Sequence, residues 1–171
     1  IELSHQAAVI EMGISGFGEM SRLAAMARPD IAVFTVIGHA HLEFLRDLDG
    51  VLRAKTEMLG YMADDALAIM NGDDEKLRGF DCRQRKLLFG LSEGCDIRAE
   101  NIRLGENGST DCDITCGGRH IAAHIPAYGQ HMVYAALEGA AAGIAMGLTD
   151  AEIERGIASY ETVGRRGAVT E

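Results

Sequence analysis

A seven-residue apolar run from Ile31 to Ile37 constrains the fold of this chain more than any other stretch. Pro29 and Asp30 precede it, Gly38 follows it, and it is rich in β-branched residues. A short apolar run between turn residues predicts a strand that is buried on both faces, as strands of parallel sheets are. The chain is therefore expected to be an α/β domain.

The preceding residues extend this strand into a larger unit. Ala7 to Glu11 is a second apolar run and predicts another buried strand, while Glu19 to Arg28 carries apolar residues at helical spacing. The glycines between them read G-x-x-G-x-G, which is not the G-x-G-x-x-G of a dinucleotide-binding loop. Strand, glycine turn, helix and strand predict a right-handed βαβ unit, and Leu67 to Met70 predicts a further strand.

The second half of the sequence has a different pattern, with short β-type segments separated by Gly, Asn, Ser and Asp. This pattern predicts an antiparallel meander. A helix is expected within Pro126 to Met146, and a capping box at Thr149 to Glu152 opens a last helix that reaches about Tyr160. We therefore predict a mostly parallel sheet flanked by helices, with an antiparallel meander in the second half. The predicted meander strands are Leu87–Phe89, Ile97–Leu104, Asp111–Thr115 and Arg119–Ile125.

Polar residues follow the Ile31–Ile37 run, and ligands of open α/β sheets gather at the carboxyl ends of strands. His39 and His41 stand there, and Asp49 is predicted to cap a helix over roughly residues 50–62 that contains Lys55. From spacing alone, a loop histidine and a solvated helical lysine are the ordinary interpretation.

The order of the motifs favours a more specific interpretation. The sequence Ala-His-Leu-Glu at 40–43, followed by Ala-Lys-Thr-Glu at 54–57, resembles the central domain of the Mur ligases, which build peptidoglycan precursors. The resemblance implies that His41 and Lys55 are catalytic, that His41 binds magnesium and that carbon dioxide carbamylates Lys55. A carbamate gives the lysine the carboxylate-like oxygen that magnesium prefers.

The sequence Glu-Met-Gly at 11–13 matches the family as well. The resemblance implies that Glu11 helps to hold the magnesium ion that bridges the ATP phosphates. Parallel strands end at the same edge of a sheet, so Glu11, His41 and Lys55 are expected to converge there and share divalent cations.

Nucleotide contacts are implied for His131 and Arg166, with Arg165 as the alternative if the alignment slips by one residue. The family motif H-N-x-x-N keeps its histidine as His131, but Met132 and Ala135 replace the two asparagines. Neither replacement can make the paired hydrogen bonds of an amide.

The resemblance covers nearly all of residues 1–171 but only the later part of the family's central domain. No phosphate-binding G-x-x-x-x-G-K-[ST] loop occurs in the sequence. We therefore expect one partial central domain that lacks this N-terminal loop and the C-terminal domain of the family.

The implied function is that of an ATP-dependent amide ligase that adds D-alanyl-D-alanine to a UDP-N-acetylmuramoyl tripeptide through an acyl phosphate. ATP, Mg²⁺ and a carbamylated Lys55 are the implied cofactors, and the partial domain alone is expected to be inactive. The alternative is a degenerate or truncated domain that keeps the fold without binding ATP. The lost asparagines favour that alternative.

Composition excludes some other classes. A net charge of −10 argues against nucleic-acid binding. The four cysteines have no disulfide-framework spacing, which predicts reduced thiols and a cytoplasmic location. The longest weakly apolar stretch, Ala135 to Leu148, is too short and not hydrophobic enough to insert into a membrane.

Two further patterns have ordinary explanations. Cys112, Cys116, His120 and His124 recur every four residues, but a two-residue hairpin at 117–118 puts the cysteines and the histidines on opposite faces. A one-residue slip would join them, so a zinc-binding module remains a weaker alternative. The sequence Asn-Gly-Asp-Asp at 71–74 predicts a turn followed by a helix N-cap rather than a metal site.

Overall fold

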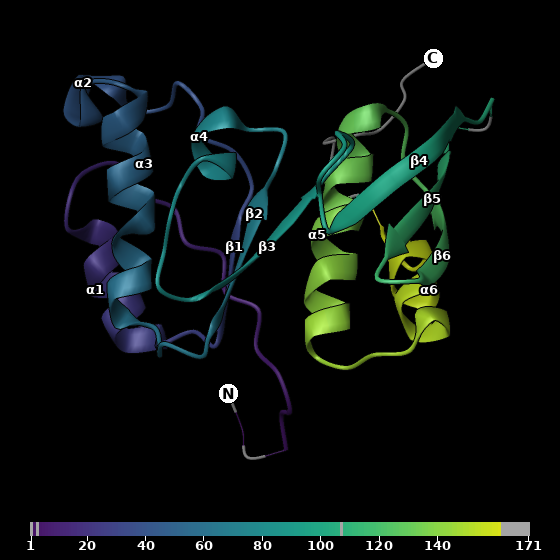
Figure 1. The fold of residues 1–171 in the computed structure, drawn as a ribbon, viewed down its shortest axis with the longest axis horizontal. Coiled ribbons are helices and arrows are strands. Elements are labelled where there is room, and N and C mark those ends of the chain that lie inside the picture. Colours follow the sequence, from purple (N-terminus) through teal and green to yellow (C-terminus); the bar gives the residue numbers. More distant parts are fainter. Residues whose placement is uncertain (1, 3, 107, 162–171) are drawn as a thin grey trace.

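One mixed sheet with flanking helices makes up the computed structural model, which describes residues 2, 4–106 and 108–161 (Figure 1). The six strands of this described part stand in sequence order. They are β1 (Ile31–Phe34), β2 (Leu67–Asn71), β3 (Arg85–Gly90), β4 (Ile97–Leu104), β5 (Thr110–Cys116) and β6 (Arg119–Ile125). The helices are α1 (Glu19–Ala27), α2 (Leu42–Leu45), α3 (Leu48–Thr56), the 3₁₀ helix η1 (Glu57–Tyr61), α4 (Glu75–Arg78), α5 (Gln130–Ala145) and α6 (Asp150–Ala158).

The direction of the strands divides the sheet into two halves. The pairs β1–β2, β2–β3 and β3–β4 are parallel, whereas the pairs β4–β5 and β5–β6 are antiparallel. This arrangement confirms the α/β class and the meander in the second half. The prediction that Leu87–Phe89 belongs to the meander is wrong, because the chain crosses over through α4 and places β3 parallel to β2.

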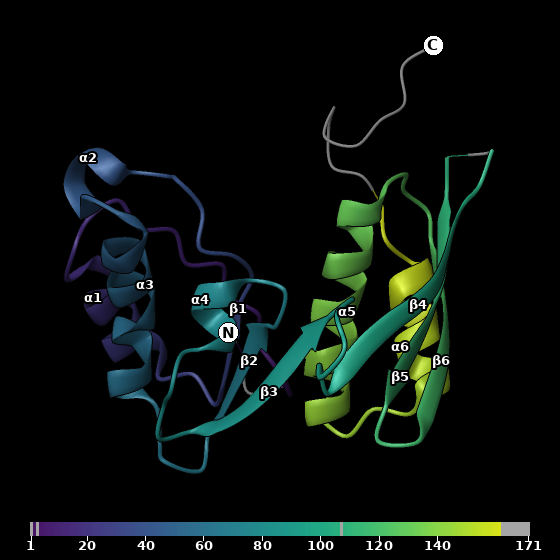
Figure 2. The same ribbon diagram turned by 45° about the horizontal axis from the view of Figure 1, so that its top comes forward.

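β3 ends beside α5, and β4 crosses in front of this helix in Figures 1 and 2. One core lies between α5, α6 and the concave side of the sheet, with Phe89, Ile114 and Leu137 fully buried. A second core lies on the other face of β1 and β2, where α3 covers Phe34 and Met70. β2 is therefore covered by α3 on one face and by α5 on the other.

Two predictions about the first strands are wrong. Ala7 to Glu11 forms no strand, and Val9 is 97% exposed, because this segment has no neighbouring strand to pair with. β1 ends at Phe34 and is not buried on both faces, since Val33 is 39% exposed. The reason is that β1 is the edge strand of the described sheet and pairs only with β2.

The start of α3 also differs from the prediction. Asp47 rather than Asp49 is the N-cap, and its carboxylate accepts a hydrogen bond from the Gly50 N–H at 2.7 Å. A β-carbon at Gly50 would lie 1.8 Å from the Leu45 carbonyl oxygen, so the close approach of these turns requires glycine. Asp49 instead forms an ion pair with Lys76 at 2.5 Å.

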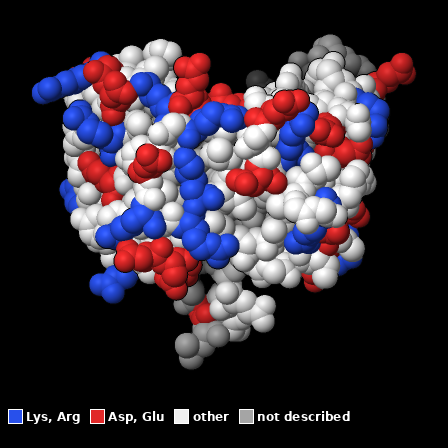
Figure 3. Space-filling view, in the orientation of Figure 1, with Lys and Arg blue, Asp and Glu red and all other residues white. Residues whose placement is uncertain are grey.

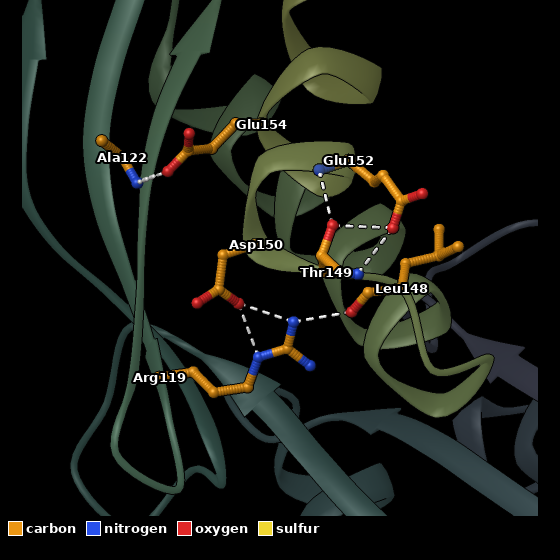
Figure 4. A network of polar contacts seen from close by, with 7 residues as sticks. All are labelled: Arg119, Ala122, Leu148, Thr149, Asp150, Glu152 and Glu154. Atoms are coloured by element: carbon orange, nitrogen blue, oxygen red, sulfur yellow. Dashed lines mark hydrogen bonds and ion pairs between the residues drawn. The ribbon is translucent and has the colours of Figure 1, made fainter.

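The second half follows the sequence closely. Cys112 pairs with Ala123 and Cys116 with Arg119, which confirms the two-residue hairpin. The capping box of α6 is present, with Thr149 and Glu152 bonded reciprocally (Figure 4). Local turn and cap signals therefore place these elements correctly.

In the described part of the chain, every helix is too short or too polar to cross a lipid bilayer.

Candidate functional site at the carboxyl ends of β1 and β2

The backbone beyond β1 is held by side chains rather than by another strand. The Asn71 side-chain amide, at the end of β2, donates to the Thr35 carbonyl at 2.8 Å. The Lys55 amine, from α3, donates to the Val36 carbonyl at 2.7 Å. These contacts replace the strand-to-strand hydrogen bonds that end with β1 and give the next residues a fixed path.

Asp74 holds the same segment from the other side. Its Oδ2 accepts the Ile37 N–H at 2.7 Å, while its Oδ1 accepts the N–H groups of Lys76 at 3.0 Å and Leu77 at 3.1 Å. The second set of bonds makes Asp74 the N-cap of α4, as the sequence predicts. One carboxylate therefore joins the end of β1 to the start of a helix.

Asp73 reaches in the opposite direction. It accepts the N–H groups of Leu91 at 2.6 Å and Ser92 at 3.0 Å and the Tyr134 hydroxyl at 2.9 Å. A β-carbon at Gly90 would lie 2.7 Å from this carboxylate, so the glycine makes room for it. Burial alone would raise the pKa of Asp73, but these hydrogen bonds outweigh burial and hold the pKa below its ordinary value.

Burial lowers the pKa of the Lys55 amine from its ordinary value, and the negative charge of Asp74 opposes that effect. The uncharged amine is the form that reacts with carbon dioxide, so desolvation favours the chemistry implied for this lysine. The sequence gives Lys55 a place in a helix, but only the structure shows that its amine points back to the end of β1.

His41 is exposed and stands at the N-cap of α2 with φ = 57°. Its carbonyl accepts the N–H groups of Phe44 and Leu45, both at 3.0 Å, which fixes the loop after β1. The Ser15 N–H is the main cause of a lowered pKa at Glu19, and the charge of His41 contributes to it.

Glu57 is a connection that the sequence did not reveal. Both of its carboxylate oxygens accept the Gly18 N–H at 3.0 Å, and its Oε2 also accepts the Ser21 hydroxyl at 2.9 Å. Glu57 thereby ties the start of α1 to the end of α3, two residues after Lys55. Lys55 and Glu57 bind different partners, since the amine donates to Val36 and the carboxylate accepts from Gly18.

Glu11 is exposed and lies in the segment before α1 that is outside the sheet. None of the hydrogen bonds or ion pairs of the described residues joins Glu11, His41 and Lys55 to one another, so their convergence stays a prediction. The same residues contain no group of three or more His, Cys, Asp or Glu side chains placed to hold a metal ion. Magnesium needs only one or two protein ligands when substrate phosphates supply the others, so the donors present fit such a shared site.

His131 is exposed in the first turn of α5 and packs against Gly129, where a β-carbon would lie 2.7 Å from the ring. Thr110 orients this turn, since its hydroxyl accepts the Gly129 N–H at 3.0 Å and donates to the Ala127 carbonyl at 2.9 Å. Arg166 and the alternative Arg165 lie outside the described residues.

The two positions that lack the family's asparagines line an apolar groove. Met132 and Ala135 on α5 face Ile153 and Ile157 on α6 across a cavity of about 270 Å³. Apolar walls offer no hydrogen bonds to a nucleotide base, in agreement with the loss of the amides.

The zinc alternative is wrong for the described residues. Cys112 is buried, while His124 lies on the outer face of the sheet and contacts Asp111 at 2.7 Å. Burial raises the pKa of the Cys112 thiol to about 11, which disfavours the thiolate that zinc requires. The hairpin register keeps the cysteines and histidines on opposite faces.

Figure 3 shows Lys and Arg side chains in a band down the middle of one face, with acidic side chains on either side. α4 carries Lys76 and Arg78, and β3 carries Arg85 and Lys86. Arg78 donates to the Gly72 carbonyl, and Lys86 donates to the carbonyls of Arg78 and Phe80. Arg78 therefore holds the turn after β2, whereas Lys86 holds the end of α4.

A family model described as the Mur ligase middle domain matches residues 2–143. The chain belongs to the Mur ligase family. The UDP-N-acetylmuramoyl-tripeptide–D-alanyl-D-alanine ligase of Bacillus subtilis (strain 168) is 30% identical over 160 residues, which cover 93% of this chain and 34% of that enzyme. The ligase of the same name from Escherichia coli (strain K12) is 29% identical over 163 residues and is covered to 36%.

Solved structures agree with this membership. A crystal structure of MurF from Acinetobacter baumannii superposes with a TM-score of 0.89 at 26% identity, over 97% of this chain and 37% of that one. MurF ligase from Thermotoga maritima in complex with ADP has a TM-score of 0.75 at 28% identity, over 92% of this chain and 36% of that one. The Mur ligase chain thus spans about a third of the length of these relatives.

Proposed function

We propose that this Mur ligase chain is part of the ATP-binding central domain of a cytoplasmic amide ligase that joins D-alanyl-D-alanine to a UDP-N-acetylmuramoyl tripeptide. The observation that carries the proposal is the match to relatives of that name over 93% of the chain. The half-buried Lys55 amine at the end of β1 supports it, because ligands of open α/β sheets gather at the carboxyl ends of strands.

Residues 1–171 would form part of one central domain, and these residues contain no G-x-x-x-x-G-K-[ST] phosphate loop. The relatives are about three times as long as the part that this chain matches. The remaining contacts to ATP and to the two substrates would come from elsewhere in a complete ligase, so this part alone is expected to be inactive.

In the proposed site, Glu11 and His41 would hold one Mg²⁺ ion and carbamylated Lys55 a second. Bound magnesium supplies positive charge that neutralises phosphate oxygens during transfer. The Lys55 amine forms a C–N bond with carbon dioxide and releases a proton to solvent, which leaves a carbamate oxygen for the metal. His131 and Arg166 would orient the nucleotide while the substrate carboxylate becomes an acyl phosphate.

Calorimetric titration of the 171-residue chain with Mg²⁺ and ATP tests the site. We expect weak binding, with Kd of about 1 mM, because the phosphate loop is missing. His41→Ala abolishes the heat, whereas His39→Ala, which changes an exposed histidine of the same loop, leaves it unchanged. An equal loss of binding heat in both variants, or a binding heat that His41→Ala does not change, contradicts the proposed role of His41.

A second candidate is a domain that keeps the fold without binding ATP. The apolar groove around Met132 and Ala135 favours it, since these positions lack the amides of the family. Absence of heat up to about 10 mM ATP supports this candidate. The double variant Met132→Asn, Ala135→Asn then shows whether restoring both amides restores binding.

A further inference from the structure

The turn at residues 71–74 has a role that the proposed reaction does not include. Its polar side chains reach the ends of two other strands. Asn71 donates to the Thr35 carbonyl and Asp74 accepts the Ile37 N–H beyond β1, while Asp73 accepts two N–H groups beyond β3. The turn after β2 is therefore the point from which the neighbouring strand ends are held.

Asp74 and Lys55 form hydrogen bonds with the same peptide group. The Val36–Ile37 peptide has its carbonyl bonded to the Lys55 amine at 2.7 Å and its N–H bonded to Asp74 Oδ2 at 2.7 Å. The C=O and N–H of one trans peptide point in opposite directions and belong to one rigid plane. A peptide that is held at both groups cannot turn, so the Asp74 bond fixes the carbonyl that Lys55 contacts.

We propose that Asp74 is a positioning residue for Lys55: by holding the Ile37 N–H it aims the Val36 carbonyl at the Lys55 amine and so keeps that amine at the end of β1. The inference rests on the proposed function only for the chemical role of Lys55. The second oxygen of Asp74 caps α4, which makes the position of the carboxylate independent of Lys55.

The two oxygens allow the positioning role to be separated from the capping role. Serine is a good N-cap, but its single short hydroxyl cannot serve α4 and the Ile37 N–H at once. In Asp74→Ser we expect the Leu77 amide, which reports the cap, to exchange within about twofold of wild type. The Ile37 amide exchanges about tenfold faster, as expected for a lost hydrogen bond to a carboxylate.

The Lys55 side chain supplies the reading that a merely structural role does not move. In Asp74→Ser the ¹³Cε resonance of Lys55 shifts toward that of a solvated lysine, while Asp74→Ala gives the same shift and also frees the Leu77 amide. An Ile37 amide that stays protected in Asp74→Ser overturns the proposal, and so does a released Ile37 amide with an unmoved Lys55 resonance.

A substitute variant and a separate test of the proposed ligase function complete the experiment. If Asp74→Ser does not fold, Asp74→Asn replaces it, because the asparagine amide nitrogen cannot accept and only one of the two contacts survives. A wild-type chain that shows no carbamate on Lys55 in ¹³C-bicarbonate counts against the proposed ligase function. The Ile37 and Lys55 readings decide the role of Asp74 separately.

Discussion

The parallel and antiparallel halves of the sheet satisfy their backbones in different ways. β5 and β6 pair along their whole length, from Thr110 opposite Ile125 to Cys116 opposite Arg119. β3 and β4 pair only at Phe89 and Gly90, and β1 ends at Phe34. Where pairing ends early, side chains take over the backbone groups, and this is where Lys55 gathers its partners. The chemistry proposed for Lys55 would therefore take place where the sheet is incomplete.

The two outer edges of the sheet also differ, because a helix covers the β6 edge whereas side chains at the β1 edge are exposed. α6 covers β6: Arg119 contacts Asp150 at 2.6 Å and the Leu148 carbonyl at 2.7 Å, and Glu154 accepts the Ala122 N–H at 3.1 Å (Figure 4). These contacts close an edge that would otherwise present free N–H groups. On the β1 side, Val33 and the nearby Val36 are 39% and 51% exposed.

Ile121→Ala should have the largest effect and should leave the site intact. Ile121 is fully buried in β6, so its truncation is expected to lower the free energy of unfolding by about 3 kcal/mol. Urea unfolding measures the loss, and the ¹³Cε resonance of Lys55 should not move under native conditions. A shifted Lys55 resonance would show that the halves are coupled rather than separate.

Asn71→Ala tests the opposite half and should destabilise the chain by about 2 kcal/mol, because it leaves a carbonyl beyond β1 without its donor. Asn71→Asp is the matched control: it keeps the acceptor for the Asp73 N–H but loses the donor to Thr35. Exchange of the backbone amides at 35–38 should accelerate in both variants. Unchanged exchange would mean that the side chains do not hold this segment.

Glu138 on α5, between the two halves, should make stability depend on pH. Burial raises its pKa to about 7 from 4.5, so the folded state binds the proton more tightly than the unfolded chain. The resulting stability is complete below about pH 4.5 and is lost as the pH rises through about 7. Glu138→Gln removes this loss and should be more stable than wild type by about 1 kcal/mol at about pH 8, after discounting for partial exposure.

Thermal unfolding at several pH values checks the sign of this effect. The advantage of Glu138→Gln over wild type should shrink as the pH falls from about 8 to about 5. An advantage that stays constant over this range would contradict a titrating Glu138.

Asp150→Asn should have the smallest effect, about 0.5 kcal/mol, because its ion pair with Arg119 is partly exposed. The loss should diminish in about 1 M salt, where exposed charges are screened. Urea unfolding at low and high salt measures it. A loss above about 2 kcal/mol would show that the closed β6 edge depends on this one contact.

Much of the candidate site could be anticipated from the order of its motifs, but not its contacts. The sequence placed Lys55 in a helix and Asp74 at an N-cap, and both placements are confirmed. It assigned Asp74 no further role, because the Ile37 N–H that it binds lies 37 positions away in the chain. Arg166 stays a prediction outside the described residues.

The sequence by itself determined the features whose causes lie within a few residues: the hairpin at 117–118, the capping box at Thr149, and the bounds of β4 and β6. Only the tertiary structure decided that β3 runs parallel to β2, that residues 7–11 stay outside the sheet, and that Lys55 points to the end of β1. Turns and caps are settled by neighbouring residues, whereas a strand or a buried amine needs partners from distant parts of the chain.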